Sequence, residues 1–258
     1  MILRGRSIAR GRATATLLLI DRPFSFLGGV NVHSGMLSST SGAEGAVISE
    51  TVFAFPSGKG STVGSYTLLQ MKREGTLPAA MINRRAEPIV ATGAVMAGVP
   101  LVDSIELDLL RSGDRVTVDG DEGTVELHDL AEDRVVTCIV THHGKMLLLK
   151  RGHEVRANKG LWGGVSGYIE NGEAPEETAQ KEVREETGIE GAKLMKAGKV
   201  QSIRAEGRIW QVHPFLFEAS TDKVRIDWEH TEYRWIEPDR VDEFDTVPGL
   251  RRVLDALK

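Results

Sequence analysis

The stretch from Gly167 to Ile189, GYIENGEAPEETAQKEVREETGI, constrains what this chain can fold into more than any other part of the sequence. Pro175 suits the first position of a helix, and the two glutamates that follow it favour the positive end of the helix dipole. Gly188 suits a helix that ends in a left-handed residue. The pattern therefore predicts a loop, a helix over residues 175–187 and a second loop.

Three carboxylates share one face of this predicted helix. Glu182 lies three residues from Glu185 and four from Glu186, so the three side chains are neighbours on the helix surface. Like charges at this spacing repel by about 0.2–0.5 kcal/mol per pair. A hard divalent cation removes that repulsion by sharing the carboxylate oxygens. A Mg²⁺ site, with Mn²⁺ as an alternative ion, is one interpretation, and a solvated acidic helix face is the other.

The spacing of glycines and glutamates in this stretch resembles a known motif. Gly167, five residues, Glu173, seven residues and then KEVREETGI match the Nudix box, in which the last nine positions read R-E-U-x-E-E-x-G-U with U aliphatic. Gly188 occupies the glycine near the end of the motif. Lys181 stands where the family has arginine, and lysine keeps the charge but lacks the bidentate fork.

The resemblance implies a fold and an activity for the second half of the chain. The fold is an α/β/α sandwich with a mixed sheet, and the activity is Mg²⁺-dependent hydrolysis of a diphosphate linkage in a small-molecule substrate. The family's metal-binding and catalytic carboxylates fall on Glu182, Glu185 and Glu186, with Glu173 in support. A later segment, WEHTEYRW, resembles a strand near the catalytic groove of Nudix proteins, and either Glu229 or Glu232 in it supplies a further carboxylate.

Composition limits the other function classes. The chain has 258 residues, enough for two ordinary domains, with 27% charged residues and a formal net charge of -5. This balance predicts no nucleic-acid surface. Cys138 is the one cysteine, so neither a disulfide nor a cysteine-held cluster is expected within the chain. Apolar runs such as residues 14–20 are too short to span a membrane, and the first residues lack the apolar core of a signal peptide, so we expect a cytoplasmic protein.

The first half of the chain contains a second glycine-rich stretch. Residues 46–55 alternate in the manner of a strand, and SGKGSTVGS, residues 57–65, leads into a predicted helix over residues 65–73. A strand, a glycine-rich turn and a helix start can bind an anion through free backbone amides, although a simple tight turn is the alternative. The motif is not a nucleotide P-loop, because its glycine and lysine spacing differs. Arg84 and Arg85 follow a second short strand, where they meet an anionic substrate or solvent.

The segments SFLGGV, FPSGKGSTVGS and INRRAEPIVATGAV together resemble a second family. That family is the swivel domain of the aconitase-X group, found as the small subunit of phosphomevalonate dehydratase, and the resemblance covers most of residues 1–128. It implies a swivelling β/α domain and a hydro-lyase of isoprenoid biosynthesis in which Ser61 acts in the dehydration. Lys59 would help to hold an alkoxide-like serine, and Lys59, Arg84 and Arg85 would bind the substrate. The iron–sulfur cluster would belong to a partner, an aconitase-like large subunit.

The sequence thus predicts two domains, residues 1–128 and residues 135–258, joined by the polar linker DLAEDR over residues 129–134. In the second domain, residues 224–227 are expected to form a strand. A fusion of two domains suggests related pathways, so an isoprenoid diphosphate is an alternative to a nucleoside diphosphate derivative as substrate. Two functions remain open: a diphosphate hydrolase, or the small subunit of a hydro-lyase.

Overall fold

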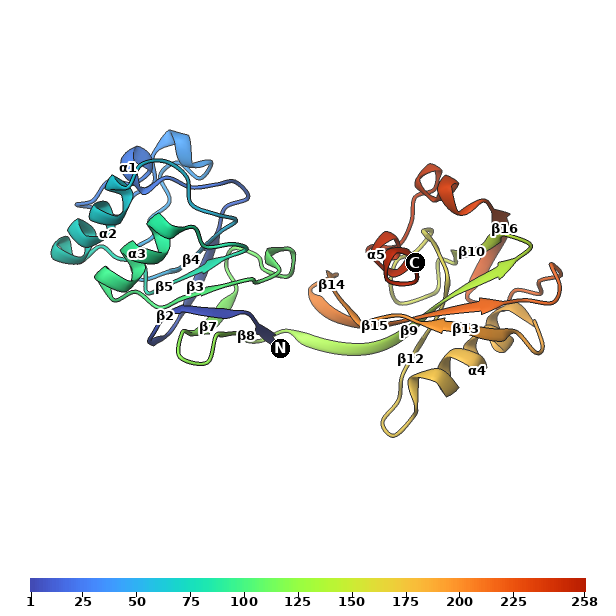
Figure 1. Cartoon of the computed structure of the whole chain (residues 1–258). Helices are drawn as coiled ribbons and strands as arrows, with labels where there is room; N and C mark the ends of the chain where they lie inside the picture. The colour runs from blue at the N-terminus through green and yellow to red at the C-terminus, as the bar shows by residue number, and fades with distance from the viewer. The chain divides into compact units, whose positions relative to one another are not determined.

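The structure, a computed structural model, describes all of residues 1–258 and divides the chain into two compact units, Met1–Leu130 and Ala131–Lys258. Figure 1 shows both units, and each is described by itself below. None of the helices combines the length and the apolar character needed to cross a bilayer.

The first unit is built on an eight-stranded sheet whose order is β1-β8-β7-β3-β4-β5-β6-β2. Its four central strands, β3 to β6, run parallel, and the strands on both sides of them pair antiparallel. The strands are β1 (Ile2–Arg4), β2 (Arg6–Ala9), β3 (Arg12–Leu19), β4 (Val52–Phe55), β5 (Ala80–Asn83), β6 (Leu101–Asp103), β7 (Arg115–Asp119) and β8 (Thr124–Leu127).

Two helices cover one face of this sheet and close its core (Figure 1). The helical elements are the single turn α1 (Phe26–Gly29), α2 (Val63–Glu74), α3 (Pro88–Ala97) and the short 3₁₀ turns η1 (Ser39–Ser41) and η2 (Leu107–Leu109). Under the helices, the ring of Phe24 packs edge-on against Phe26 and Phe53, with both centroid distances 5.0 Å. Aromatic pairs in this arrangement add to the hydrophobic stabilisation of a core.

The boundaries in the first unit differ from expectation at the glycine-rich stretch. The strand predicted over residues 46–55 begins only at Val52, because the preceding residues form loop structure and Val47 bridges to Met36 instead. The helix predicted over residues 65–73 is the central part of α2, which starts two residues earlier at Val63.

The second unit is a mixed sheet in which β9 and β15 run parallel and the other pairs are antiparallel. The path β11-β10-β9-β15-β13 forms its main body, while β12 pairs with β9, β14 with β15 and β16 with β10. The strands are β9 (Ala131–His142), β10 (Lys145–Arg151), β11 (Trp162–Gly163), β12 (Val165–Tyr168), β13 (Lys193–Ala197), β14 (Gln201–Ala205), β15 (Arg208–Glu218) and β16 (His230–Ile236).

One helix packs on each face of this sheet, which gives the predicted α/β/α sandwich (Figure 1). Alternation along β9 separates the two cores: Val136 and Cys138 face α4 (Pro175–Thr187), whereas Val135 and Ile139 face α5 (Leu250–Ala256). A six-residue 3₁₀ helix, η3 (Pro238–Glu243), precedes α5.

The helix predicted over residues 175–187 is confirmed as α4, and Gly188 ends it with a left-handed φ of 67°. Two other expectations were wrong. Residues 131–134 of the predicted linker lie in β9, because they pair with the start of β15 and Asp133 forms an ion pair with Arg208. Residues 224–227 form no strand; Arg225 donates its backbone N–H to Thr187 at the end of α4 instead.

Candidate functional site

The side chain of Glu182 lies directly over the backbone of β12. A Cβ atom added at Gly167 would lie 2.2 Å from the carboxyl carbon of Glu182, which is far too close for any side chain. Gly167 is therefore required by close approach, and its φ is not in the left-handed region. The glycine lets α4 place a carboxylate against the strand beneath it.

Glu186, one helical turn further along, is almost completely buried, with 3% of its surface exposed. Its Oε1 accepts a 3.3 Å hydrogen bond from the backbone N–H of Ser166 in β12. Its Oε2 is buried and makes no hydrogen bond. A buried carboxylate oxygen without a partner is costly, because its hydration is lost and not replaced.

Electrostatics in this region favour proton or cation uptake. Burial raises the pKa of Glu186 well above its usual range, and the charge of Glu182 raises it further. Burial is also the main cause of the raised pKa of Glu182, with added repulsion from Glu185 and Glu229. Burial raises the pKa of the Cys138 thiol, and the charges of Glu186 and Glu182 raise it further, so this cysteine stays protonated.

The structure distinguishes the two candidates for the further carboxylate. Glu229 faces the site: its charge raises the pKa of both Glu182 and Glu186, and it lines the same cavity as Gly167. Glu232 instead accepts a 2.7 Å hydrogen bond from Arg234 in its own strand. Glu229 is therefore the residue of this segment that belongs to the site.

A bulge in the β10–β16 pair puts His230 and Glu232 on opposite faces of the sheet. Lys150 pairs with Glu232, but the next residue, Arg151, pairs with His230, so Thr231 has no opposite partner. Such an extra residue resets which face the following side chains point to. His230 is consequently buried while Glu232 is half-exposed.

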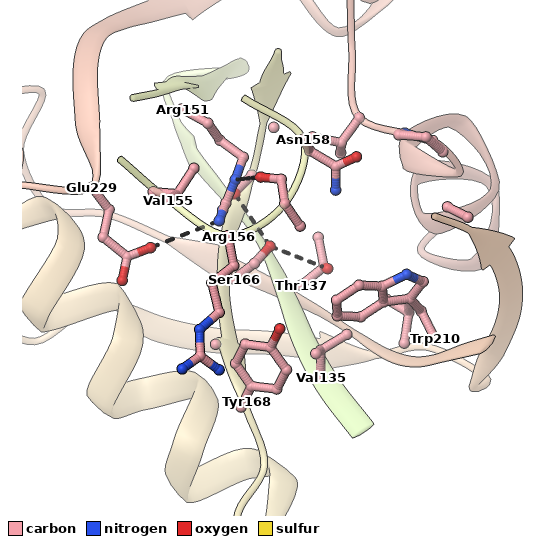
Figure 2. A pocket seen from close by; sticks show the side chains of 18 of the residues that line it. Val135, Thr137, Arg151, Val155, Arg156, Asn158, Ser166, Tyr168, Trp210 and Glu229 are labelled. Carbon is pink, nitrogen blue, oxygen red and sulfur yellow. Dashed lines mark hydrogen bonds and ion pairs between the residues drawn. The ribbon is translucent and has the colours of Figure 1, made fainter. Parts of the chain in front are cut away.

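A cavity of about 420 Å³ is lined by Glu229 and by Ser166 and Gly167 of β12, the strand that Glu182 and Glu186 contact (Figure 2). Arg151 holds Glu229 at 3.7 Å on one side, and Arg156 extends beside Tyr168 on another. The rings of Tyr168 and Trp210 lie 5.9 Å apart and form an aromatic wall. Apolar side chains complete the lining: Val135, Val155, Ile203, Val212 and Val247.

The remaining residues predicted from the box take supporting or peripheral places. Glu173 accepts hydrogen bonds from the backbone N–H of Glu170 and the hydroxyl of Thr178, and the first of these is the main cause of its lowered pKa. Lys181 is exposed, and its charge lowers the pKa of both Glu173 and Glu182. Glu173 therefore braces the loop before α4.

The donor set suits a hard divalent cation such as Mg²⁺ or Mn²⁺. The oxygens of Glu182 and Glu186 repel each other, and a cation shared between them would offset both their repulsion and the unpartnered state of the buried Oε2. Glu185 is exposed, and no three His, Cys, Asp or Glu side chains form a ready ligand cluster in this structure. The three-carboxylate metal site stays a prediction.

Residue-by-residue reading of the sequence missed His230 and Asp227. The imidazole of His230 is fully buried, with Nδ1 2.9 Å from Asp227 Oδ1 and Nε2 3.6 Å from Glu186 Oε2. The signal in the sequence is a histidine at a buried strand position, where an apolar residue is expected. This position is known to be buried only once the bulge in the β10–β16 pair is known.

In the first unit, the predicted residues gather at one edge of the sheet. Lys59 and Ser61 follow β4, and Arg84 and Arg85 follow β5, so all four lie beyond the carboxyl ends of parallel strands, where α/β sheets bind ligands. Ser61 is exposed at the start of α2 and accepts a weak 3.4 Å hydrogen bond from the N–H of Val63. Lys59 lines a small hollow with Ser25 and Thr40, whereas Arg84 turns away to pair with Asp108 at 2.7 Å.

Comparisons with known proteins agree with this division of the chain. Residues 2–127 match the family model for the aconitase X swivel domain, and residues 131–257 match that for the NUDIX domain. The phosphomevalonate dehydratase small subunit of Thermococcus onnurineus is 48% identical over 130 residues, which are 50% of this chain and 100% of that protein. The chain belongs to the aconitase X swivel family. Its second half is a NUDIX domain.

Other matches are similar to only one half of the chain. The phosphomevalonate dehydratase small subunit of Methanocaldococcus jannaschii is 42% identical over 127 residues, which are 49% of this chain and 98% of that protein. The crystal structure of Thermococcus kodakaraensis aconitase X is 40% identical, covers 50% of this chain and 99% of that chain, and has a TM-score of 0.49. The MutT protein from Methanosarcina mazei Go1 is 23% identical, covers 50% of this chain and 98% of that chain, and has a TM-score of 0.43.

We expect Gly167→Ala to displace Glu182 without unfolding the NUDIX domain, because the added Cβ would meet the movable end of that side chain. Mn²⁺ affinity, measured by calorimetry, should fall by at least about tenfold. Gly163→Ala is the matched control, since its Cβ would make an ordinary 3.4 Å contact with Val247. Unchanged Mn²⁺ affinity in Gly167→Ala would contradict the claim that a glycine is needed at this position to seat Glu182.

We expect Glu186→Gln to gain stability over the wild type as the pH rises, in the presence of a chelator. A carboxyl whose pKa is raised on folding binds more protons in the folded chain, so its contribution is full near its ordinary pKa of about 4.3 and is lost as pH rises through the raised pKa. Glutamine does not titrate, so the variant does not lose stability in this way. In the wild type the loss amounts to about 1.4 kcal/mol for each unit by which folding raises the pKa of Glu186.

Urea unfolding of the two proteins between about pH 5 and pH 8 measures this difference. The exposed Glu177 on the same helix provides the control variant Glu177→Gln. If the free energies of unfolding of the wild type and of Glu186→Gln changed with pH in the same way, Glu186 would not take up a proton on folding.

Proposed function

We propose that this protein is a divalent-cation-dependent hydrolase that cleaves a diphosphate linkage in a small molecule. The observation that carries the proposal is the pair of half-buried Glu182 and buried Glu186. Their raised pKa values and the unpartnered Oε2 of Glu186 favour a cation, and a cavity of substrate size lies next to the strand that both side chains contact. The match of residues 131–257 to the NUDIX domain supports the same reaction class.

The residues around the cavity have distinct tasks in this proposal. Bound Mg²⁺ would neutralise the diphosphate and lower the pKa of a water molecule. Glu182, half-exposed and with a raised pKa, accepts the proton of the water that adds to phosphorus, while the bridging P–O bond breaks and its electrons leave with the phosphate released. Arg151 and Arg156 bind the phosphate oxygens, and Tyr168 and Trp210 pack against the organic group.

Hydrolysis by the purified chain with Mg²⁺ tests the proposal. Release of phosphate and pyrophosphate is followed across nucleoside, sugar, dinucleotide and isoprenoid diphosphates, since an apolar and aromatic wall accepts either a base or a hydrocarbon group. Glu186→Gln should lose activity by about 100-fold or more. Because this variant is expected to be no less stable, its loss cannot be ascribed to unfolding. Glu177→Gln should remain active, and a folded chain inactive on every substrate would overturn the proposal.

A second function is favoured by the first half of the chain. Its 48% identity extends over the whole length of a phosphomevalonate dehydratase small subunit, and Lys59, Ser61 and Arg85 share one sheet edge. We propose that the swivel domain completes the site of a hydro-lyase whose iron–sulfur cluster is held by an aconitase-like large subunit. There Lys59 and the loop amides would hold Ser61 in its reactive, alkoxide-like form, and Ser61 would act on the substrate proton.

Reconstitution with such a large subunit tests this second function. Ser61→Ala should lower the dehydration rate by about 100-fold, because a group that transfers a proton is lost. Ser57→Ala in the same loop provides the control. Full activity of Ser61→Ala in a formed complex would instead favour a swivel domain that only binds its partner.

A further inference from the structure

The loop between β10 and β11 forms one wall of the cavity. Residues 154–158 of this loop line the cavity, and Val155 among them is buried. The two ends of the loop are joined through Arg151, whose backbone N–H donates to the carbonyl of Leu161 at 2.9 Å and whose carbonyl accepts from the N–H of Gly160 at 3.0 Å. The loop is therefore closed at its base, and the side chains between its ends are presented to the cavity.

Asn158 is held in this loop by its backbone. Its φ is 55°, in the left-handed region, which asparagine adopts more readily than most residues. Its backbone N–H donates a 3.1 Å hydrogen bond to Oε1 of Glu206 in the turn between β14 and β15, and its carbonyl accepts a 3.2 Å bond from the N–H of Leu161. With both backbone groups bound, the direction in which the side chain leaves the loop is fixed.

The side chain of Asn158 is half-buried and points into the cavity, on the side where Thr137 and Trp210 lie (Figure 2). Its amide makes no hydrogen bond within the chain. The hydroxyls of Thr137 and Ser166, by contrast, lie 3.3 Å apart and hydrogen-bond to each other. An amide offers a donor and an acceptor side by side in one plane. Asn158 therefore has both of them free for a ligand.

Aromatic rings line the cavity near this amide (Figure 2). The indole of Trp210 is partly buried against the core of the domain, and the Tyr168 ring lies 5.9 Å from it with the two planes inclined at 49°. A planar ring that packs against an aromatic face keeps its own hydrogen-bonding groups in its plane, so these groups point to the neighbouring walls. A heterocycle seated there can offer an edge to Asn158, whereas a hydrocarbon chain would cover the amide and leave it without a partner.

We propose that Asn158 determines which organic group the NUDIX domain accepts. Its amide binds the donor and acceptor edge of a planar heterocycle, such as a nucleobase, and disfavours a hydrocarbon chain. Glu206 is a positioning residue, because it holds the backbone from which the amide extends. The inference rests on the proposed function in one respect, since it takes this cavity as the place of the organic group of the substrate. A pair of hydrogen bonds between an amide and the edge of a base discriminates by about 10–100-fold.

Binding of monophosphates to the purified full chain with Mg²⁺, measured by calorimetry, tests the inference without any turnover. AMP, GMP, CMP and UMP share the phosphate with geranyl monophosphate and differ from it in the organic group. The wild type should bind at least one of these nucleotides about tenfold more tightly than geranyl monophosphate. Asn158→Gly suits a left-handed φ and removes the amide. Its affinity for that nucleotide should fall by about 10–100-fold, while its affinity for geranyl monophosphate should not fall.

Further variants separate the amide from the loop that carries it. Asn158→Asp keeps the size of the side chain but replaces its donors by acceptors, so the order of affinities among the nucleotides should change. Glu206→Ala should reduce the preference for a nucleotide, and Glu206→Gln should retain it, because an amide oxygen still accepts from the backbone N–H of Asn158. Lys159→Gly is the matched control, since Lys159 is exposed in the same loop and lies outside the cavity lining. Thermal unfolding of every variant is measured in parallel.

The outcomes are distinguishable. A nucleotide preference that is lost in Asn158→Gly and retained in Lys159→Gly supports the role of Asn158. Equal or tighter binding of geranyl monophosphate by the wild type overturns it, as does a preference that Asn158→Gly leaves unchanged, or the absence of binding of every ligand. Equal preferences in Glu206→Ala and in the wild type overturn only the role of Glu206. Failure of the proposed function is a separate result, because it appears as a folded chain that hydrolyses no diphosphate substrate.

Discussion

The burial of the Glu186 carboxylate against two strands is the interaction on which the rest of the NUDIX domain depends. Transfer of an ionised carboxylate from water into a protein interior costs several kcal/mol unless it is paired and hydrogen-bonded. Here one oxygen has only the N–H of Ser166 and the other has only the imidazole of His230 nearby. Oε2 of Glu186 is thus buried in this domain without a hydrogen bond from the fold.

Local and distant parts of the sequence contribute to this site differently. The helix α4 supplies Glu182 and Glu186 from adjacent turns, and Gly167 allows the first of them to rest on β12. The turn at Asp227 supplies its groups from about forty residues further along, through the pairing of β16 with β10. The candidate site is therefore assembled only when the sheet has formed in the correct register.

This difference explains how much could be predicted from the sequence. The bounds of α4 follow from Pro175 and Gly188, which act on the residues next to them, and both families follow from contiguous motifs. The burial of His230 depends on a bulge at Thr231 in the β10–β16 pair, which no local pattern reveals. The polar start of β9 has the local pattern of a linker, because its partner strand, with Arg208, lies some 75 residues later.

The strand order of the first unit bears on how this protein is made. β1 at the N-terminus pairs with β8, the last strand of the swivel domain, with Ile2 opposite Glu126. During synthesis β1 therefore has no partner until β8, at the far end of this unit, has been made. During that interval the unpaired backbone groups of β1 are open to pairing with other chains. The NUDIX sequence follows only after the swivel domain has all its strands, so the two domains can fold one after the other.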